Sequence, residues 1–301
     1  MALGTNHVTN ATAGTFIPEL WSDEIIAAYK QNLVMANLVS KMSFKGKKGD
    51  TLHIPKPTRG AASLKAASNQ VTLQAATESE VQVLVNKHYE YSRLIEDITE
   101  AQALASLRKF YTGDAGYALA KQVDTDLVFL GRGVNGGDGT AAYTGAIIGS
   151  GNTAYTGSNA AAISDAGIRA AIQKLDDADV PMDGRVLVLP PVARNVMMGL
   201  ARFTEQAFTG EVGGGNTIRN GEIGNVYGVK VFVTTNADAA TSGDRIGLMF
   251  TKDAFVLAEQ MGVRSQTQYK QEYLGTLFTS DMLYGVAELR DEAAVAIAMP
   301  A

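Results

Sequence analysis

The chain contains one glycine-rich motif, Gly131-Arg-Gly-Val-Asn-Gly136, whose spacing fits the G-x-G-x-x-G pattern of dinucleotide-binding loops. In such a loop a strand leads in and a helix follows, so that the helix N-terminus receives the pyrophosphate. Here a helical pattern precedes the motif, and a stretch rich in Gly, Thr and Ala follows it. The context therefore favours a connector, and a nucleotide-dependent enzyme that uses 131–136 remains a remote alternative.

Two carboxylates, Asp124 and Asp126, are candidates for a paired acid–base site. Side chains at i and i+2 of a helix point apart, so we expect both on a solvated face. Metal ligands are scarce, because the chain has no cysteine and its three histidines, His7, His53 and His88, share no helical or hairpin spacing. We therefore predict no metal site, no cofactor and no catalytic residue, which means that the protein is not an enzyme.

The composition is that of a folded protein, with 46% hydrophobic and 19% charged residues among 301. A net charge of −5 argues against a generic nucleic-acid coat, because phosphate binding needs a basic surface. No apolar stretch approaches the ~20 residues that span a bilayer, and the first ten residues lack the pattern of a signal peptide. We expect a soluble protein made in a cytoplasm.

One long hairpin is predicted between Asp50 and Asp97, with a strand-like run at 50–57, a polar tip at 58–70 and a returning run at 81–91. An isolated two-stranded ribbon is only marginally stable in water. The sequence therefore predicts that another subunit covers this ribbon.

Charge is distributed unevenly along the hairpin, because the charged residues of 41–70 are mostly basic and those of 77–100 are mostly acidic. One interpretation is a solvated ribbon with cross-strand ion pairs. The other is docking between copies, in which charge sets the register. The second interpretation predicts inter-subunit contacts at Lys45, Lys47, Lys48, Lys56, Arg59, Lys65, Glu78 and Glu80.

The rest of the chain mixes helices and strands, which indicates an elongated part interrupted by a compact α/β insert. Helices are expected from Pro18 to about Ser40 and from Ile98 to about Leu130, where Gly113 and Gly116 could bend or break the second. The insert should contain a helix capped by Ser164. Further expected elements are a strand at 185–189, a helix from 190, and strands at 226–234, 246–250, 254–258, 266–273, 283–289 and 293–298.

Two local runs, Val180-Pro-Met-Asp-Gly-Arg-Val-Leu-Val-Leu-Pro190 and Gly221-Glu-Ile-Gly-Asn-Val-Tyr-Gly-Val-Lys-Val231, are similar to runs in capsid proteins of short-tailed phages. The order of the elements also resembles the major capsid proteins of tailed double-stranded DNA bacteriophages, whose α+β fold is called HK97-like. The resemblance covers essentially the whole chain. It implies an N-terminal arm and first helix at 1–45, an extended β-hairpin loop at 46–96, a peripheral domain with its spine helix at 97–134 and 244–301, and an axial domain at 135–243.

The resemblance implies a structural protein whose hexamers and pentamers form an icosahedral head around double-stranded DNA, without sequence-specific DNA binding. It implies a location in the virion, with assembly in the host bacterial cytoplasm. Because only a short segment precedes Pro18, a separate scaffolding protein is expected. A portal protein and a decoration protein are further expected partners, and no membrane is involved. The alternative within assembly proteins is an encapsulin-like nanocompartment shell.

Overall fold

The computed structural model describes residues 33–43, 45–46, 48–57, 60–68, 70–71, 73, 78–102, 107–200 and 224–301. Several expectations fall outside these ranges, namely the arm at 1–16, most of the helix from Pro18, and the contacts of Lys47 and Arg59.

The first described elements are a short helix and a short strand. Helix α1 spans Met35–Leu38, with Val34 as its N-cap, and strand β1 spans Ser40–Ser43. Residues 33–34 are not helical, so the helix expected from Pro18 does not continue unbroken to about Ser40. Strand β1 pairs in parallel with β10, Phe255–Lys270, and thereby joins a four-stranded sheet of order β1-β10-β11-β4. The early part of the chain is thus tied to strands near the C-terminus.

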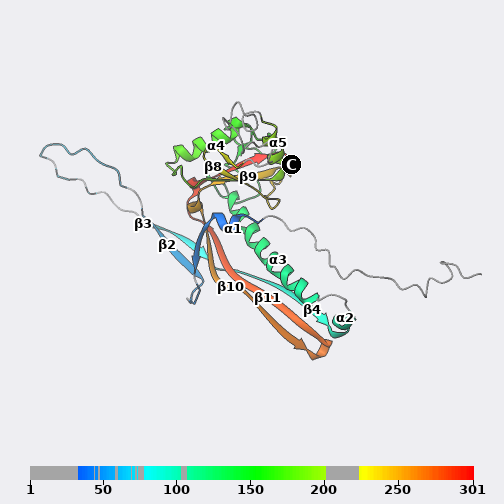
Figure 1. Cartoon of the computed structure of the whole chain (residues 1–301). Helices are drawn as coiled ribbons and strands as arrows, with labels where there is room; N and C mark the ends of the chain where they lie inside the picture. The colour runs from blue at the N-terminus through cyan, green and yellow to red at the C-terminus, as the bar shows by residue number, and fades with distance from the viewer. Residues whose placement is uncertain are drawn as a thin grey trace, which may run out of the picture.

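The long strands of this sheet run beside the spine helix (Figure 1). Strand β11, Gly275–Glu288, pairs antiparallel with β10 on one side and with β4, Lys87–Glu96, on the other. The sequence pattern suggested separate strands at 254–258 and 266–273, and placed the next strand at 283–289. The register shifts of β10 between Glu259 and Arg264 explain the first error, because they interrupt the alternation of side chains within one strand.

The spine is helix α3, Leu107–Phe129, preceded by α2, Asp97–Gln102, and followed by the 3₁₀ turn Leu130–Arg132. Helix α3 continues through Gly113 and Gly116, so these residues do not break it. A methyl group at either glycine would meet no atom within 4 Å. At 1.5 Å per residue, α3 is about 35 Å long.

The predicted hairpin is shorter than expected. Strands β2, Thr51–Pro57, and β3, Glu78–Leu84, form a separate two-stranded sheet of seven residue pairs. The returning run does not continue along β2, because β4 pairs with β11 over ten residues instead. Tyr89 and Tyr91 of β4 also contact the body, the first by stacking on Tyr284 and the second by donating a hydrogen bond to Asp114 of α3.

A second sheet forms the compact part, in the order β5-β12-β9-β6-β8-β7. The strands are β5 at Ile147–Ile148, β6 at Val186–Leu189, β7 at Asn225–Val226, β8 at Val229–Val233, β9 at Arg245–Phe250 and β12 at Ala294–Met299. The boundary expected between 243 and 244 crosses this sheet, because β9 and β12 lie in it. Two helices complete this part, α4 at Asp165–Asp177, which Ser164 caps as expected, and α5 at Pro191–Met198.

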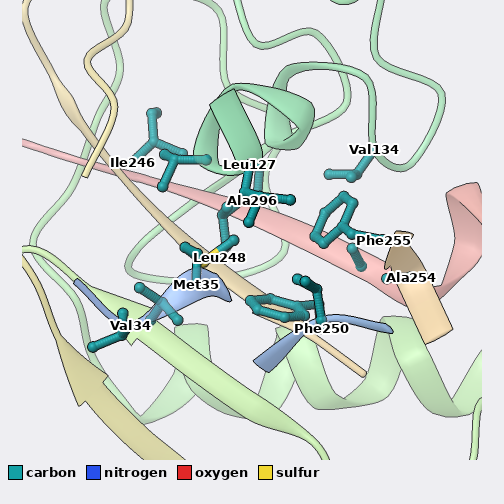
Figure 2. Packing of buried hydrophobic residues seen from close by; sticks show 14 of the residues in the cluster. Val34, Met35, Leu127, Val134, Ile246, Leu248, Phe250, Ala254, Phe255 and Ala296 are labelled. Atoms are coloured by element: carbon teal, nitrogen blue, oxygen red, sulfur yellow. The ribbon is translucent and has the colours of Figure 1, made fainter. Parts of the chain in front are cut away.

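The main core lies where the spine meets this sheet (Figure 2). Leu127 of α3 is fully buried near Leu248, and Phe250 packs edge-on against Phe255 with ring centroids 5.2 Å apart. Met35 of α1 is buried in the same cluster. The core therefore joins the elongated and the compact parts. Among the described residues, no helix is both long and apolar enough to cross a membrane.

Candidate assembly surface

The ribbon formed by β2 and β3 is anchored to the body by one face, on which Leu52 and Ile54 are partly buried, and is exposed on the other face. At the base, Val83 and Val85 are buried against Val256 and Ala258 of β10. The Val85 N–H donates to the Asp50 carbonyl at 2.7 Å, which closes the ribbon at this end. From there the ribbon projects away from the body (Figure 1). The anchor sets the direction of the ribbon, and the chain itself leaves the described residues of the tip exposed.

Large apolar side chains are fully exposed near the tip of the ribbon. Leu64 is 101% exposed and Leu73 is 92% exposed. Burying such a side chain stabilises a protein by about 1.5–3 kcal/mol, and the isolated chain does not gain this stabilisation from Leu64 or Leu73. The exposed tip is therefore suited to contact another molecule.

The predicted contact residues that the structure describes lie on exposed parts of the ribbon and its base. Lys48, Lys56 and Lys65 are exposed. Lys45 forms an ion pair with Glu259 of the same chain, with Nζ and Oε2 3.1 Å apart. For Lys45, an intramolecular partner was not anticipated.

Between the two strands, the described ion pair joins Glu80 to a histidine rather than to a lysine. His53 Nδ1 lies 3.0 Å from Glu80 Oε2, and Gln82 donates to Glu80 Oε1 at 2.6 Å. These two hydrogen bonds, from Gln82 first and then from His53, lower the pKa of Glu80. The carboxylate is thus ionised and accessible. The Glu78 side chain lies outside the described side chains.

The two spine carboxylates are buried, so their expected position on a solvated face is wrong. Asp124 is 0% exposed and Asp126 is 5% exposed. Asp124 accepts hydrogen bonds from the Met35 N–H at 2.7 Å and from Asn236 Nδ2 at 3.1 Å. Burial raises the pKa of Asp124, although these hydrogen bonds oppose the shift.

Asp126 holds a second buried junction. It accepts a hydrogen bond from the Tyr284 hydroxyl at 2.6 Å and pairs with Lys87 Nζ at 3.0 Å. Burial, together with this carboxylate, raises the pKa of Tyr284. The two aspartates point apart as expected, but each points to a different neighbouring element. The signal in the sequence was that Leu127 and Val128, three and four positions after Asp124, belong to the buried side of the helix.

The glycine motif is a packed turn. A methyl group on Gly131 would lie 2.5 Å from Leu248, and one on Gly133 would lie 2.9 Å from Glu288 Oε2. The Gly136 N–H, with φ of 76°, donates to both carboxylate oxygens of Asp291 at 3.0 Å. The backbone donor that a phosphate would require is thus occupied by the chain's own carboxylate.

Beside this turn lies an acidic cluster. The pKa of Glu288 is raised to about 7, mainly by burial. The charge of Asp291, a hydrogen bond with Asp291 and the charge of Glu292 raise it further, in that order. Lys56 of the ribbon opposes this shift. The turn after the spine and Lys56, which lies near the distal end of β2, therefore both influence one carboxyl group whose pKa is raised to about 7.

A contrasting carboxylate lies in the middle of the long sheet. Arg264 donates to Asp281 at 2.8 and 2.9 Å, and His88 Nε2 lies 3.0 Å from it. The hydrogen bonds of Arg264, and then of His88, lower the pKa of Asp281 to about 2. This cluster ties β4, β10 and β11 together. Within the described ranges, no group of histidine and carboxylate side chains could hold a metal ion.

Comparison with known proteins gives one family and many similar structures. Residues 95–297 match the sequence model of a family described as phage capsid protein. A structure from Mycobacterium phage Che8 is 25% identical, with a TM-score of 0.75, over 94% of this chain and 97% of that chain. No curated protein sequence matches significantly.

Two further structures share the fold at lower identity. The capsid of the cyanophage P-SCSP1u is 18% identical, with a TM-score of 0.74, over 99% of this chain and 96% of that chain. The head of the Helicobacter pylori bacteriophage KHP40 is 12% identical, with a TM-score of 0.74, over 99% of both chains. The likeness thus includes the ribbon, the spine and the compact part together.

Proposed function

The chain belongs to the phage capsid protein family, and we propose that its copies assemble as hexamers and pentamers into an icosahedral head around double-stranded DNA. The observation that carries this assembly is the anchored, uncovered ribbon, whose tip exposes Leu64 and Leu73. Many such contacts, each of ordinary strength, stabilise a closed shell through multivalency. The similar structures described above are phage capsids and a phage head, so the encapsulin-like shell and the nucleotide-dependent enzyme are set aside.

Within this proposal the parts of the chain take different positions in the shell. The extended loop at 46–96 reaches a neighbouring copy. The peripheral domain at 97–134 and 244–301 carries the spine and contributes β9 and β12 to the sheet of the axial domain at 135–243, which surrounds the capsomer centre. A net charge of −5 suits a wall that holds DNA without binding it tightly. Inter-subunit contacts are assigned to Lys48, Lys56, Lys65 and Glu80, together with Lys45, Lys47, Arg59 and Glu78.

Further partners follow from the same proposal. A separate scaffolding protein directs curvature, a portal protein occupies one vertex, and a decoration protein is an additional candidate on the shell surface. Assembly takes place in the host bacterial cytoplasm, and the product is the virion head. The protein acts as a structural component and not as an enzyme.

The test is to express the chain with a candidate scaffolding protein and to examine the product by negative-stain electron microscopy. Closed shells of uniform size are expected. A product that stays a small soluble oligomer under these conditions would contradict the proposal. Shells that enclose a cellular enzyme in place of DNA during infection would support the encapsulin-like alternative.

A further inference from the structure

The backbone hydrogen bonds of the ribbon identify which groups face its outer edges. Strands β2 and β3 pair only with each other in the described part of the chain, with continuous register from Thr51↔Leu84 to Pro57↔Glu78. In an antiparallel pair, residue pairs that exchange hydrogen bonds alternate with pairs whose N–H and C=O groups point away. Val85 donates to Asp50, so this pair exchanges hydrogen bonds and the next pair, Thr51 with Leu84, does not. The outward-pointing positions are therefore every second residue from there, at 51, 53, 55 and 57 on β2 and at 84, 82, 80 and 78 on β3.

Two prolines lie on the outer edge of β2. Pro55 and Pro57 occupy outward-pointing positions, so the N–H groups that they lack are those that would have faced a further strand. Prolines at such positions block the addition of a strand at a sheet edge. The outward donors that remain on β2 are at Thr51 and His53, near the base. The distal half of this edge has none.

The outer edge of β3 retains every donor. The outward residues are Glu78, Glu80, Gln82 and Leu84. The first three have an N–H and C=O that face the edge, whereas the Leu84 carbonyl lies against Gly285 of β11. Glu80 and Gln82 are exposed, whereas Val83 is buried against the body. From 78 to 82 the edge thus has an outward donor and acceptor at every second residue, bordered by the ionised carboxylate of Glu80.

We propose that the outer edge of β3 is the one edge of the ribbon that adds a strand, and that this strand comes from a second copy of the chain. The inference rests on the proposed shell function and specifies the groups by which the ribbon binds its neighbour. Hydrogen bonds between backbone groups supply the affinity in this mode, and side chains select the partner. The prolines of β2 prevent a second neighbour from binding the opposite edge.

Charge indicates which segment of the second copy is bound. The edge at β3 is acidic, and the strongest run of basic residues in the chain lies in and directly after the edge strand β1, at Lys41, Lys45, Lys47 and Lys48. Lys41 and Lys48 are exposed, and neither forms an ion pair within the described ranges. A segment from about 40 to 48 of the second copy therefore fits the edge in charge.

The deciding experiment uses two proline variants at one residue pair. Gln82→Pro removes an outward N–H from β3, and His53→Pro removes the opposite outward N–H from β2. Neither change removes a backbone hydrogen bond inside the ribbon, and each removes one side-chain hydrogen bond to Glu80, so the two variants are matched in this respect. Shell yield, measured by sedimentation and electron microscopy, should fall about tenfold or more for Gln82→Pro, the ratio that about 1.4 kcal/mol produces. It should change little for His53→Pro.

Thermal unfolding of the unassembled variants controls for folding. If Gln82→Pro fails to fold, Glu80→Pro replaces it. Glu80 is paired with Pro55, so this pair already lacks one outward N–H. His53→Pro remains the control, because both variants lose the contact between His53 and Glu80. Equal shell yields for the β2 and β3 variants would overturn the inference while leaving the shell function intact. Failure of the unmodified chain to form shells would instead contradict the proposed function.

The partner is tested by reversing charges. Glu80→Lys should lower the shell yield, and adding Lys48→Glu to the same chain should restore it. No restoration would overturn the assignment of the strand to the second copy's basic segment. Loss of scaffolding-protein binding, with shell formation by the chain unchanged, would show that the edge binds that protein and would also overturn the inference.

Discussion

Asp124 and Met35, 89 positions apart in the chain, are joined by a buried hydrogen bond of 2.7 Å from the Met35 N–H to Asp124 Oδ1. The other oxygen of Asp124 accepts from Asn236, which precedes β9 in the compact part. One carboxylate therefore connects the start of α1, the spine and the compact part. Because these contacts are buried, they hold the three elements in one arrangement.

Replacing Asp124 with alanine is expected to destabilise the unassembled chain by about 3 kcal/mol, because the buried N–H of Met35 and the Asn236 amide lose their acceptor. Asp124→Asn keeps one acceptor and should lose less. Urea denaturation monitored by circular dichroism measures both. Asp183→Ala, at an exposed aspartate, is the control and should stay within about 0.5 kcal/mol. A small effect of Asp124→Ala would contradict the structural role of this carboxylate.

Two glycine-to-alanine changes are expected to shift the free energy of unfolding in opposite directions. In Gly137→Ala the new methyl group would lie 2.3 Å from the Arg132 carbonyl oxygen, so the turn must shift, at a cost of about 2 kcal/mol. In Gly113→Ala the methyl group meets no atom within 4 Å and lies in α3, where alanine is favoured over glycine by about 1 kcal/mol. Denaturant titrations of both variants test this difference. Destabilisation by Gly113→Ala would show that the helix needs this glycine.

Glu288 is expected to make the chain less stable as the pH rises from about 4.5 to about 7. Its pKa is about 7 in the folded chain, against an ordinary value of 4.5, so the folded state binds the proton more tightly between these values. The loss of stability that comes from ionising Glu288 in the folded chain is absent below pH 4.5 and complete above pH 7. Glu288→Gln should therefore be more stable than the unmodified chain by about 1–2 kcal/mol at pH 8, with no difference near pH 4. Unfolding curves at several pH values measure this, and parallel pH profiles of the two proteins would refute it.

Reversing the basic residues at the base of the ribbon should affect assembly more than folding. Lys45→Glu is combined with Lys47→Glu and Lys48→Glu. Among the described residues this change removes one exposed ion pair, that of Lys45 with Glu259, which contributes at most about 1 kcal/mol. Shell yield should fall strongly, because each contact is repeated across the shell. Sedimentation measures assembly, and thermal unfolding measures stability. A parallel loss of both would indicate an intramolecular role for these lysines.

Local patterns in the sequence were sufficient for elements whose own residues decide their structure. Ser164 was predicted to cap a helix, and its hydroxyl accepts from the Gly167 N–H at 3.2 Å. The strand at 186–189 and the helix after Pro190 were also predicted correctly. Local patterns were insufficient where a distant partner decides. Strand β4 does not continue the hairpin, because it forms ten residue pairs with β11, which lies almost two hundred residues later in the chain.

By itself, the sequence determined that the chain folds around helices and alternating strands, that it has no cysteine chemistry, and that its order of elements is that of phage capsid proteins. Only the tertiary structure decided which polar groups are buried and which edges are open. Asp124 is ordinary in sequence and buried in the fold, and Pro55 matters because the register turns its missing N–H outward. The physical reason is that burial and edge exposure depend on neighbours distant in the chain, which no local pattern contains.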